Sequence, residues 1–217
     1  AALIANVSQE RIRDELTKIL LSNQPGKGIL ELNAQGLLVY ILPELHACVG
    51  FDQKSEHHDK SIFDHIIAVV DGTPARLNVR LAALLHDIGK PATKEWDEQV
   101  GWTFKNHNYV GYKMIPAIFR NLKLPLGEPL KFVQKIVLLH MRPIVLIEDE
   151  ISDSAVRRLL FDAGDDIDKL MLLCEADITS GNQEKVNLYL NNFKIVRQKL
   201  VEVEEKDRIR NFQPPIK

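Results

Sequence analysis

The sequence predicts an all-α fold with one small insertion that is not helical. Apolar residues recur at helical spacing along most of the chain, and Ser, Gly and Pro stand where such helices would begin and end. Residues 92–105 break this pattern. With 217 residues, of which 45% are hydrophobic, the chain can bury a core as one large domain or as one domain with an extension.

The N-terminal part predicts a helix followed by a shorter apolar segment. The hydroxyl of Ser8 can cap the helix, and a Pro-Gly-Lys-Gly run at residues 25–28 is expected to break it. The apolar face of this helix comprises Ile12, Leu16, Ile19 and Leu20. The segment LLVYILPEL follows Gly36, and the polar stretch 51–60 is interpreted as a loop or as the approach to the next helix.

Two helices and the insertion are expected in the middle of the chain. One helix begins near Ser61 and ends at residues 71–74, and the next runs from about Arg76 to Ile88, before Gly89 and Pro91. The apolar side of the first comprises Ile62, Ile66, Val69 and Val70. The insertion suits a small β-hairpin or an ordered loop, since Trp96, Trp102, Thr103 and Phe104 surround Gly101. Further helices are expected near Asn106, near Glu128, after Ser152, after Asp165 and after Asn182.

Composition and charge exclude several classes of protein. Charged residues make up 27% and the formal net charge is −2, so the chain lacks the strongly basic balance of many nucleic-acid-binding proteins, although a local basic patch is compatible with it. No apolar run approaches the roughly 20 residues of a membrane span, and no signal peptide opens the chain. Cys48 and Cys174 stand among apolar neighbours and are expected to be buried thiols in a cytoplasmic protein.

Histidines and aspartates interrupt or end the expected apolar helices. They are His65, His86, Asp87, His107, His140 and Asp177. Any one such histidine is usually a core or boundary residue, and a single aspartate near a helix end is more often a cap. Together they indicate a shared site, because buried charge is costly unless it is paired or bound to metal. The adjacent His86 and Asp87 can both reach one cation, as in metal sites inside helical bundles. His57 and His58 lie in a polar run and are expected at the surface or boundary.

The order H…HD…H…H…D, with the local string LLHDIGK, resembles the HD-domain metal-dependent phosphohydrolases. The resemblance implies an HD-domain helical bundle with a helical neck before it. It implies that His65, His86, Asp87 and Asp177 hold the primary metal. It also implies that His107 and His140 bind a second metal or the phosphate, and that Lys90 lies near the substrate phosphate, so that Asp87 and Lys90 are the catalytic candidates.

The resemblance extends to the N-terminal part. Residues 8–45 are similar to the segment that follows the nucleotide-adding half of bacterial CCA-adding tRNA nucleotidyltransferases and poly(A) polymerases, where it forms a helical neck implicated in RNA binding. AALLHDIGKPAT and FKNHNYVG are similar to the HD part of those proteins, and RNFQPPI to its end. The expected division is a neck at 1–50, the HD domain at 51–204 and a linker or tail at 205–217. The nucleotidyltransferase head is absent from these residues.

The chain starts with Ala1 rather than Met, and residues 213–217 are interpreted as a shortened linker. We therefore expect a piece of a longer protein, with a processed or tagged full-length protein as the alternative. tRNA is then an expected partner through the parent enzyme, and the oligomeric state is open.

Mixed imidazole and carboxylate ligands suit Mn²⁺, Fe²⁺, Ni²⁺ or Co²⁺, with Mg²⁺ as a further option. Such a site predicts hydrolysis of a phosphoester or nucleotide substrate, either a phosphomonoester or a 2′,3′-cyclic phosphodiester. One alternative is an RNA-binding or RNA-positioning module of a CCA-adding or poly(A) polymerase enzyme with little hydrolytic activity of its own. Another is a regulatory helical domain with a vestigial site, which the complete set of ligands argues against.

Two weaker signals concern nucleotide addition and RNA. The string GDDID at residues 164–168 imitates the paired aspartates of nucleotidyltransferases, but it follows a helical sequence, so Asp166 and Asp168 are expected to be acids at a helix start. Basic side chains could face RNA phosphates, although such residues interleaved with acids usually form a solvated face. The candidates are Arg11, Arg157 and Arg158, with Arg13, Lys18 and Lys169 beside them.

Overall fold

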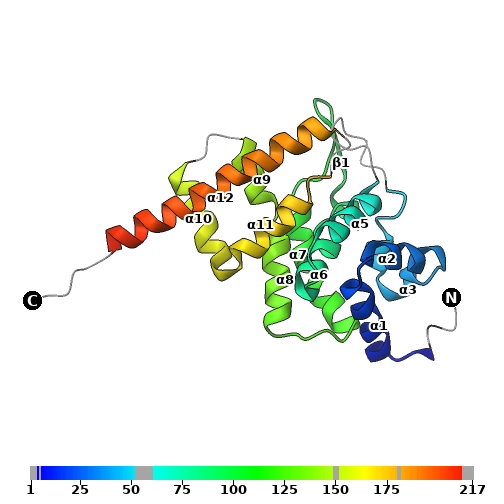
Figure 1. The fold of residues 1–217 in the computed structure, drawn as a ribbon. Coiled ribbons are helices and arrows are strands. Elements are labelled where there is room, and N and C mark those ends of the chain that lie inside the picture. The colour runs from blue at the N-terminus through cyan, green and yellow to red at the C-terminus, as the bar shows by residue number, and fades with distance from the viewer. Residues whose placement is uncertain (1–3, 5, 52–60, 149–151, 180–181, 212–217) are drawn as a thin grey trace, which may run out of the picture.

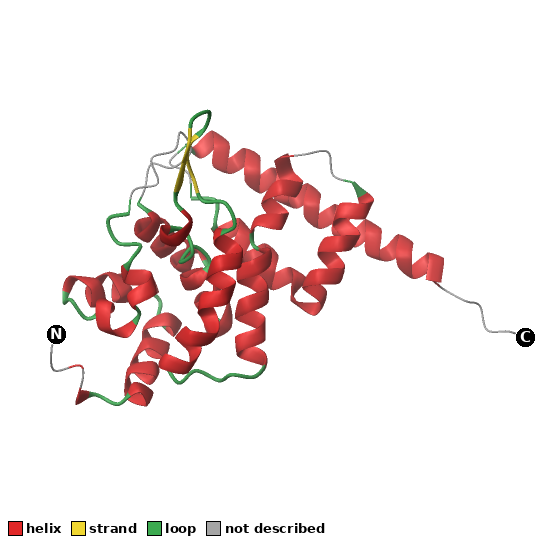
Figure 2. Cartoon of the chain, turned by 180° about the vertical axis from the view of Figure 1, so that it is seen from behind, coloured by secondary structure: helices red, strands yellow, loops and turns green. Residues whose placement is uncertain are grey.

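The computed structural model describes residues 4, 6–51, 61–148, 152–179 and 182–211, and it confirms the predicted all-α fold (Figures 1 and 2). His57 and His58 lie outside the described residues. The helices before the hairpin are α1 (Gln9–Leu21), α2 (Pro25–Ala34), α3 (Leu38–Ile41), α4 (Pro43–His46), α5 (Ile62–Gly72) and α6 (Leu77–Leu85). After it come α7 (His107–Asn121), α8 (Glu128–Leu139), α9 (Met141–Glu148), α10 (Asp153–Ala163), α11 (Ile167–Ala176) and α12 (Gln183–Asn211).

The N-terminal helix α1 begins as predicted, but the Pro-Gly-Lys-Gly run does not remain a break. The Ser8 hydroxyl accepts a hydrogen bond from the Arg11 amide, and the helix ends at Leu21. Pro25 is then the first residue of α2, and Gly26 to Gly28 continue its first turn. Proline is tolerated at this position because the first amides of a helix lack partners inside it. The break therefore covers only the residues between Leu21 and Pro25.

The neck, residues 1–50, packs on the remainder of the fold through α1 and α2, which contact α6 and α5 respectively. The buried guanidinium of Arg80 in α6 ties the two parts together. It donates to the carbonyl oxygens of Leu20 and Ser22 at the end of α1, and to that of Thr73 at the end of α5. In addition, the Gly26 amide donates to Asp71 Oδ1 at 2.8 Å. The division at residue 50 is a prediction that these contacts do not test.

Replacing Arg80 with Met is expected to loosen the neck. The variant keeps much of the apolar stem but removes the charged donor from two buried carbonyl oxygens and one part-buried carbonyl oxygen, at a cost of about 3 kcal/mol in the free energy of unfolding. Urea unfolding and limited proteolysis between α1 and α2 measure the effect. Arg76→Met is the matched control, because Arg76 precedes α6 and is exposed. Equal stability of the two variants would contradict this role for Arg80.

The central helices α5 and α6 are buried over most of their surface. His65 faces inward from α5 among Ile62, Ile66 and Val69. The helix α6 ends at Leu85, and not at Ile88 as the sequence suggested, so that residues 86–90 form a turn that remains buried. This turn places both His86 and Asp87 at the end of a helix that is itself in the core.

The insertion is a β-hairpin, after a 3-10 turn (Pro91–Thr93), formed by β1 (Glu95–Asp97) and antiparallel β2 (Gly101–Thr103). Asp97 Oδ1 accepts hydrogen bonds from the amides of Gln99 and Val100, and Gly101 adopts a φ of +80°. A loop of this length needs such a residue, which explains the glycine. Trp96 pairs with Trp102 across the two strands.

The C-terminal half contains a helix that the sequence patterns did not predict. The helix α8 ends before His140, and α9 begins at Met141 with Pro143 in its first turn. The long helix α12 runs along α9 and α10, and its C-terminal end projects beyond α10 (Figures 1 and 2). None of the helices within the described ranges is both long enough and apolar enough to span a bilayer.

Candidate metal centre

Six side chains from five helical segments converge in the interior and form what we call the His/Asp centre. His65 comes from α5, His86 and Asp87 from the turn after α6, His107 from the start of α7, His140 from the end of α8, and Asp177 from the end of α11. The side chains of the first five are at most 8% exposed and that of Asp177 is 11% exposed. Five of the six lie at helix ends, which is how helices far apart in sequence can place them together.

One triad consists of His65, His86 and Asp177. Asp177 Oδ1 lies 2.8 Å from His65 Nε2 and 3.4 Å from His86 Nε2. The two Nε2 atoms are 3.3 Å apart. The three candidate ligand atoms therefore all lie within 4.8 Å of one another, close enough to face one cation.

A second triad consists of Asp87, His107 and His140. Asp87 Oδ1 lies 3.2 Å from His107 Nε2 and 3.9 Å from His140 Nε2, and the two Nε2 atoms are 3.3 Å apart. The sequence patterns placed these histidines near the site without distinguishing a second metal from a phosphate contact. The three ligand atoms of this triad, like those of the first, all lie within 4.8 Å of one another.

Asp87 joins the two triads. Its Oδ1 faces the second triad, whereas its Oδ2 lies 3.3 Å from His86 Nε2 and 3.5 Å from His65 Nε2. Lys90 Nζ forms an ion pair with the same Oδ2 at 2.7 Å. Among the described residues, this buried oxygen nevertheless receives no hydrogen bond of good geometry. A carboxylate oxygen held in this way is suited to a cation.

The backbone orients three of the four imidazole rings. Nδ1 lies 2.7 Å from the Ala83 oxygen in His86, 2.8 Å from the Phe104 oxygen in His107 and 2.6 Å from the Val137 oxygen in His140. A carbonyl oxygen only accepts hydrogen bonds, so Nδ1 carries a proton in each ring. In the neutral form that binds a cation, Nε2 then presents its lone pair. His65 Nδ1 instead lies 2.7 Å from the Thr179 hydroxyl.

The two facing Nε2 atoms of His107 and His140 show whether the residues of the centre fit a metal ion. His107 Nε2 and His140 Nε2 are 3.3 Å apart, and with both Nδ1 atoms protonated neither can donate to the other. The pair is favourable only with positive charge between or beside the two nitrogens. Imidazole rings fixed through Nδ1 and completed by carboxylates are typical ligands of divalent transition metals. The residues present therefore fit a metal.

The electrostatics also favour positive charge at the centre. Burial lowers the pKa of His86, but the carboxylates of Asp87 and Asp177 outweigh this effect and raise it to about 10. Burial opposes ionisation of the two aspartates, yet His86 and their other cationic neighbours hold both carboxyl pKa values well below the usual range. Burial, together with the charge of His86, lowers the pKa of His140 to about 3. Both carboxylates therefore remain available as anionic ligands.

Gly89 allows the turn after α6 to approach α7 closely. A Cβ atom at this position would lie 2.1 Å from the His107 carbonyl oxygen and 2.8 Å from the Gly111 amide nitrogen. The sequence patterns treated Gly89 only as a helix stop. They also missed Thr179, which holds His65, although its place two residues after Asp177 was a usable signal.

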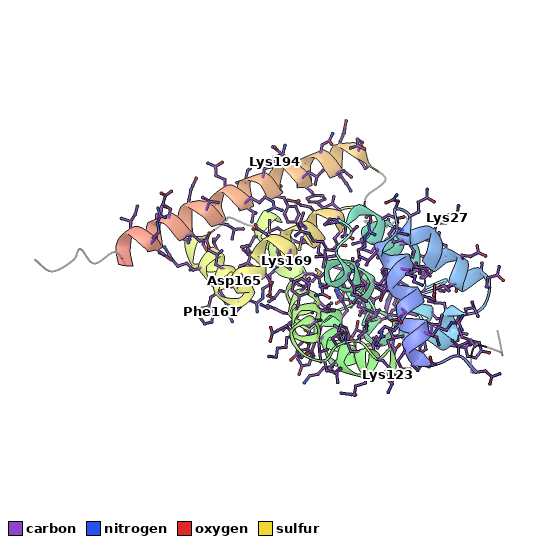
Figure 3. All side chains as sticks on the ribbon, turned by 60° about the horizontal axis from the view of Figure 1, so that its bottom comes forward. Lys27, Lys123, Phe161, Asp165, Lys169 and Lys194 are labelled. Carbon is purple, nitrogen blue, oxygen red and sulfur yellow. The ribbon has the colours of Figure 1, made fainter. Side chains whose placement is uncertain are left out.

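The weaker candidates lie away from the centre. Arg157 Nε bonds both carboxylate oxygens of Asp207, at 3.1 and 2.9 Å, whereas Arg11 and Arg158 are exposed. Asp166 directly precedes α11 and accepts hydrogen bonds from Lys135 and from Lys169, which Figure 3 labels, and Asp168 lies in the first turn of α11. The structure thus places both aspartates at a helix start, as expected. RNA contact by the three arginines stays a prediction.

Both cysteines are free thiols in the core, as predicted. Burial raises the pKa of Cys48 to about 12 and that of Cys174 well above its usual value. The Cys174 thiol donates to the His140 carbonyl oxygen at 3.1 Å, which packs α11 against the end of α8. Neither thiol is one of the ligand atoms of the triads.

The fold and the two triads define an all-α protein, with one small hairpin, whose His/Asp centre can hold metal. Comparison with known families agrees: residues 55–182 match the HD domain, and residues 1–49 match a family described as the probable RNA and SrmB-binding site of polymerase A. Because the first match covers more than half of the chain, the chain belongs to the HD-domain family. The neck and the HD domain of this chain therefore match two different families in adjoining parts of the sequence.

Curated relatives match about three quarters of the chain. The chain is 35% identical over 174 residues to the A-adding tRNA nucleotidyltransferase of Deinococcus radiodurans, a match that covers 77% of this chain and 38% of that protein. It is 34% identical over 178 residues to the CC-adding tRNA nucleotidyltransferase of Thermus thermophilus, covering 78% and 39% respectively. The multifunctional CCA protein of Stenotrophomonas maltophilia is 32% identical over 180 residues, covering 77% and 42%. The chain thus spans well under half the length of these relatives.

Proposed function

We propose that this chain hydrolyses phosphoesters at the His/Asp centre, with a phosphomonoester or a 2′,3′-cyclic phosphodiester as substrate. The observation that carries the proposal is the pair of buried triads joined by Asp87. His65, His86, Asp87 and Asp177 are the proposed ligands of a primary metal. His107 and His140 would take a second metal or the phosphate itself.

A bound Mn²⁺, Fe²⁺, Ni²⁺ or Co²⁺, or alternatively Mg²⁺, would supply a Lewis acid that polarises a phosphoryl oxygen and acidifies a water. In the net reaction a water oxygen bonds to phosphorus and an ester P–O bond breaks. The proton that the water loses ends on the departing oxygen.

The residues of the chain prepare this step. The hydrogen bonds from Nδ1 fix the rings of His86, His107 and His140, so no reorientation is needed when a ligand binds. Lys90 Nζ forms an ion pair with Asp87 Oδ2 at 2.7 Å. Its positive charge therefore lies beside the proposed metal site and can offset negative charge that develops on a phosphate.

Hydrolysis that depends on metal is the direct test. The purified chain loaded with Mn²⁺, Ni²⁺ or Co²⁺ is expected to hydrolyse 2′,3′-cyclic nucleotides or p-nitrophenyl phosphate esters. EDTA should remove the activity and the metal restore it. Offered tRNA with CTP and ATP, the same 217 residues should add no nucleotide, because GDDID forms a helix start. Hydrolysis that survives metal removal would contradict the proposal.

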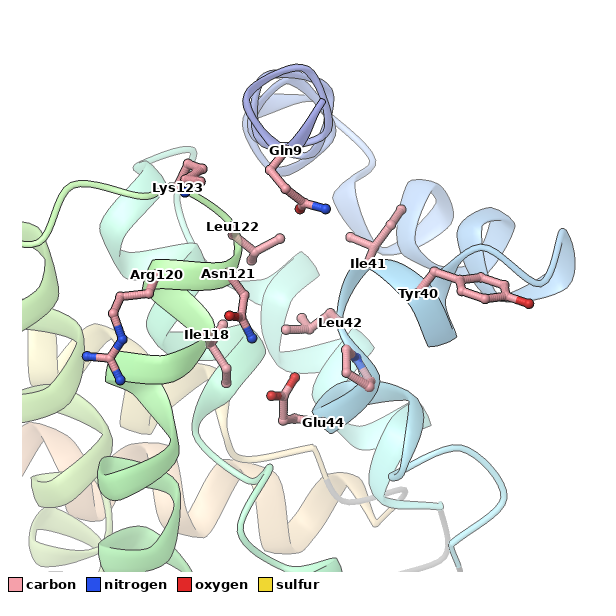
Figure 4. A pocket seen from close by; sticks show the side chains of 11 residues that line it. Gln9, Tyr40, Ile41, Leu42, Glu44, Ile118, Arg120, Asn121, Leu122 and Lys123 are labelled. Carbon is pink, nitrogen blue, oxygen red and sulfur yellow. The ribbon is translucent and has the colours of Figure 1, made fainter. Parts of the chain in front are cut away.

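A second candidate function is the binding and positioning of RNA. It is supported by the RNA-binding family matched by residues 1–49, and by a hollow of about 420 Å³ between this neck and the end of α7 (Figure 4). Tyr40 and Glu44 line it from the neck, and Arg120 and Lys123 from the α7 side. Tight tRNA binding without hydrolysis of any ester would favour this function over the first.

A further inference from the structure

The hairpin is an extension of the His/Asp centre. Its first strand begins a few residues after Lys90, and its second strand ends a few residues before His107. The Thr93 hydroxyl donates to the Gly89 carbonyl oxygen at 3.1 Å, and His107 Nδ1 donates to the Phe104 oxygen at 2.8 Å. Both ends of the hairpin are therefore fixed to the turn and the helix that carry the centre.

The two faces of the hairpin differ in character. Trp96 and Trp102 are cross-strand partners, so they share one face, and the alternation of a strand places Lys94 and Phe104 on the same side. Two contacts support this placement: Lys94 Nζ lies 4.3 Å from the centre of the Trp102 ring, and Lys90 Nζ lies 5.8 Å from that of Phe104. The acids of β1, Glu95 and Asp97, alternate to the opposite face.

The aromatic face is accessible. Trp96 is 62% exposed, and its ring meets that of Trp102 edge to face, with the ring centres 5.1 Å apart. Phe104 is half-buried where the face meets Lys90, and Lys94 Nζ also lies 4.6 Å from the centre of the Phe51 ring. A tryptophan this exposed contributes little to the core, which points to a ligand.

We propose that the face formed by Lys94, Trp96, Trp102 and Phe104 is a stacking platform for a single RNA strand whose terminal phosphate occupies the His/Asp centre. The assignment rests on the proposed function, because the phosphate locates one end of the strand. The substrate class is then the end of an RNA strand rather than a free mononucleotide.

The spacing of the aromatic residues along the hairpin supports a nucleic-acid strand as the ligand. Residues in a strand advance about 3.3 Å each, so Trp102 and its partner Trp96 lie about 7 Å farther from the centre than Phe104. Nucleotides stacked along one strand advance about 3.4 Å each. The base attached to the reacting phosphate would therefore meet Phe104 first, and the next bases would meet the tryptophans.

Chemistry supports nucleic acid over a peptide. Aromatic rings together with lysine suit bases and phosphates, and such stacking tolerates any sequence. The acids that would repel phosphates face the other way. The centre beside the platform contains the imidazole and carboxylate groups that a metal-dependent phosphate site requires.

The only tryptophans of the chain, Trp96 and Trp102, both lie on this face, so tryptophan fluorescence excited at wavelengths that tyrosine does not absorb reports on this face. EDTA-treated protein is titrated with a tetraadenylate that ends in a 3′-phosphate and, separately, with 3′-AMP. The tetranucleotide should quench the fluorescence with a Kd at least about ten-fold below that of 3′-AMP, the effect of one or more additional stacked bases.

Variants at the platform complete the test. Trp96→Ala should raise the Kd for the tetranucleotide about ten-fold and remove most of its preference over 3′-AMP, while Trp96→Phe stays within about three-fold of wild type. Phe161→Ala is the matched control, since it removes an aromatic ring that is 87% exposed on α10 (Figure 3). It should bind like wild type.

The outcomes separate the platform from the proposed function. Equal affinity for the tetranucleotide and 3′-AMP, or a tetranucleotide affinity unchanged by Trp96→Ala, would overturn the platform even if the metal-loaded protein hydrolyses cyclic nucleotides. Quenching by the tetranucleotide that Trp96→Ala weakens supports the platform even if no ester is hydrolysed. In that case the proposed hydrolysis alone fails.

Discussion

Replacing Asp87 with Ala is expected to abolish metal binding and phosphoester hydrolysis together. Among the residues that the structure describes, Asp87 is the carboxylate that contacts both triads, with Oδ1 3.2 Å from His107 Nε2 and Oδ2 3.3 Å from His86 Nε2. Its loss removes a negative charge from both proposed metal positions and breaks the buried ion pair with Lys90. Loss of a partner outside the coordination sphere typically lowers metal affinity by about 10–100-fold, and loss of a shared ligand should cost at least the upper end of that range.

Metal content measured on the purified variant, together with hydrolysis of a 2′,3′-cyclic nucleotide, checks this expectation. Since breaking a buried ion pair can cost about 3–5 kcal/mol of stability, Asp87→Asn, which keeps the size of the side chain, is measured beside it. Asp168→Ala is the matched control, because its side chain is 89% exposed at the start of α11. Retention of metal and activity by folded Asp87→Asn would exclude Asp87 as the shared ligand.

Gly89→Ala is expected to have the largest effect of any single added methyl group. The new Cβ would lie 2.1 Å from the His107 carbonyl oxygen, which is backbone and cannot rotate away. Either the turn that carries His86 and Asp87 or the start of α7 must move, at a cost of about 3 kcal/mol or more. We expect a lower unfolding midpoint in urea and weaker metal binding.

Gly111→Ala is the control for this substitution, because Gly111 faces Gly89 across the same contact. A Cβ there would meet Val137 at 3.4 Å, which is ordinary van der Waals contact, and alanine favours the helix by up to about 1 kcal/mol. We therefore expect it to be at least as stable as wild type. If both alanine variants unfold at the same urea concentration as wild type, the close approach at Gly89 is not required.

The sequence predicted most of the fold where periodicity and stop signals agreed, as at Ser8 and in the hairpin about Gly101. It misplaced elements where one local signal supports two structures. Pro25 ends one pattern but also begins a helix, and α9 follows α8 so closely that a single apolar run hides the bend at His140. Such ambiguities are resolved by packing, which no local pattern contains.

The candidate ligands could be selected from the sequence because imidazole and carboxylate groups are conspicuous in apolar helices. The grouping of Asp87 with His107 and His140, as a carboxylate shared by two triads, could not be selected in this way. The position of Asp87 between the two triads depends on the close approach of the turn at Gly89 to the backbone of α7. A glycine in the sequence does not indicate which segment it will contact. The support of His65 by Thr179 likewise requires α5 and the end of α11 to be neighbours in space.

The carbonyl groups that fix His86, His107 and His140 have an evolutionary consequence. Each acceptor lies three residues before its histidine and belongs to the main chain, so no substitution that preserves the local backbone can delete it. The orientation of these three rings is therefore robust to drift in the surrounding side chains. His65 depends instead on the Thr179 hydroxyl, which one codon change can remove. Among homologous sequences, position 179 should consequently vary far less freely than positions 83 and 137.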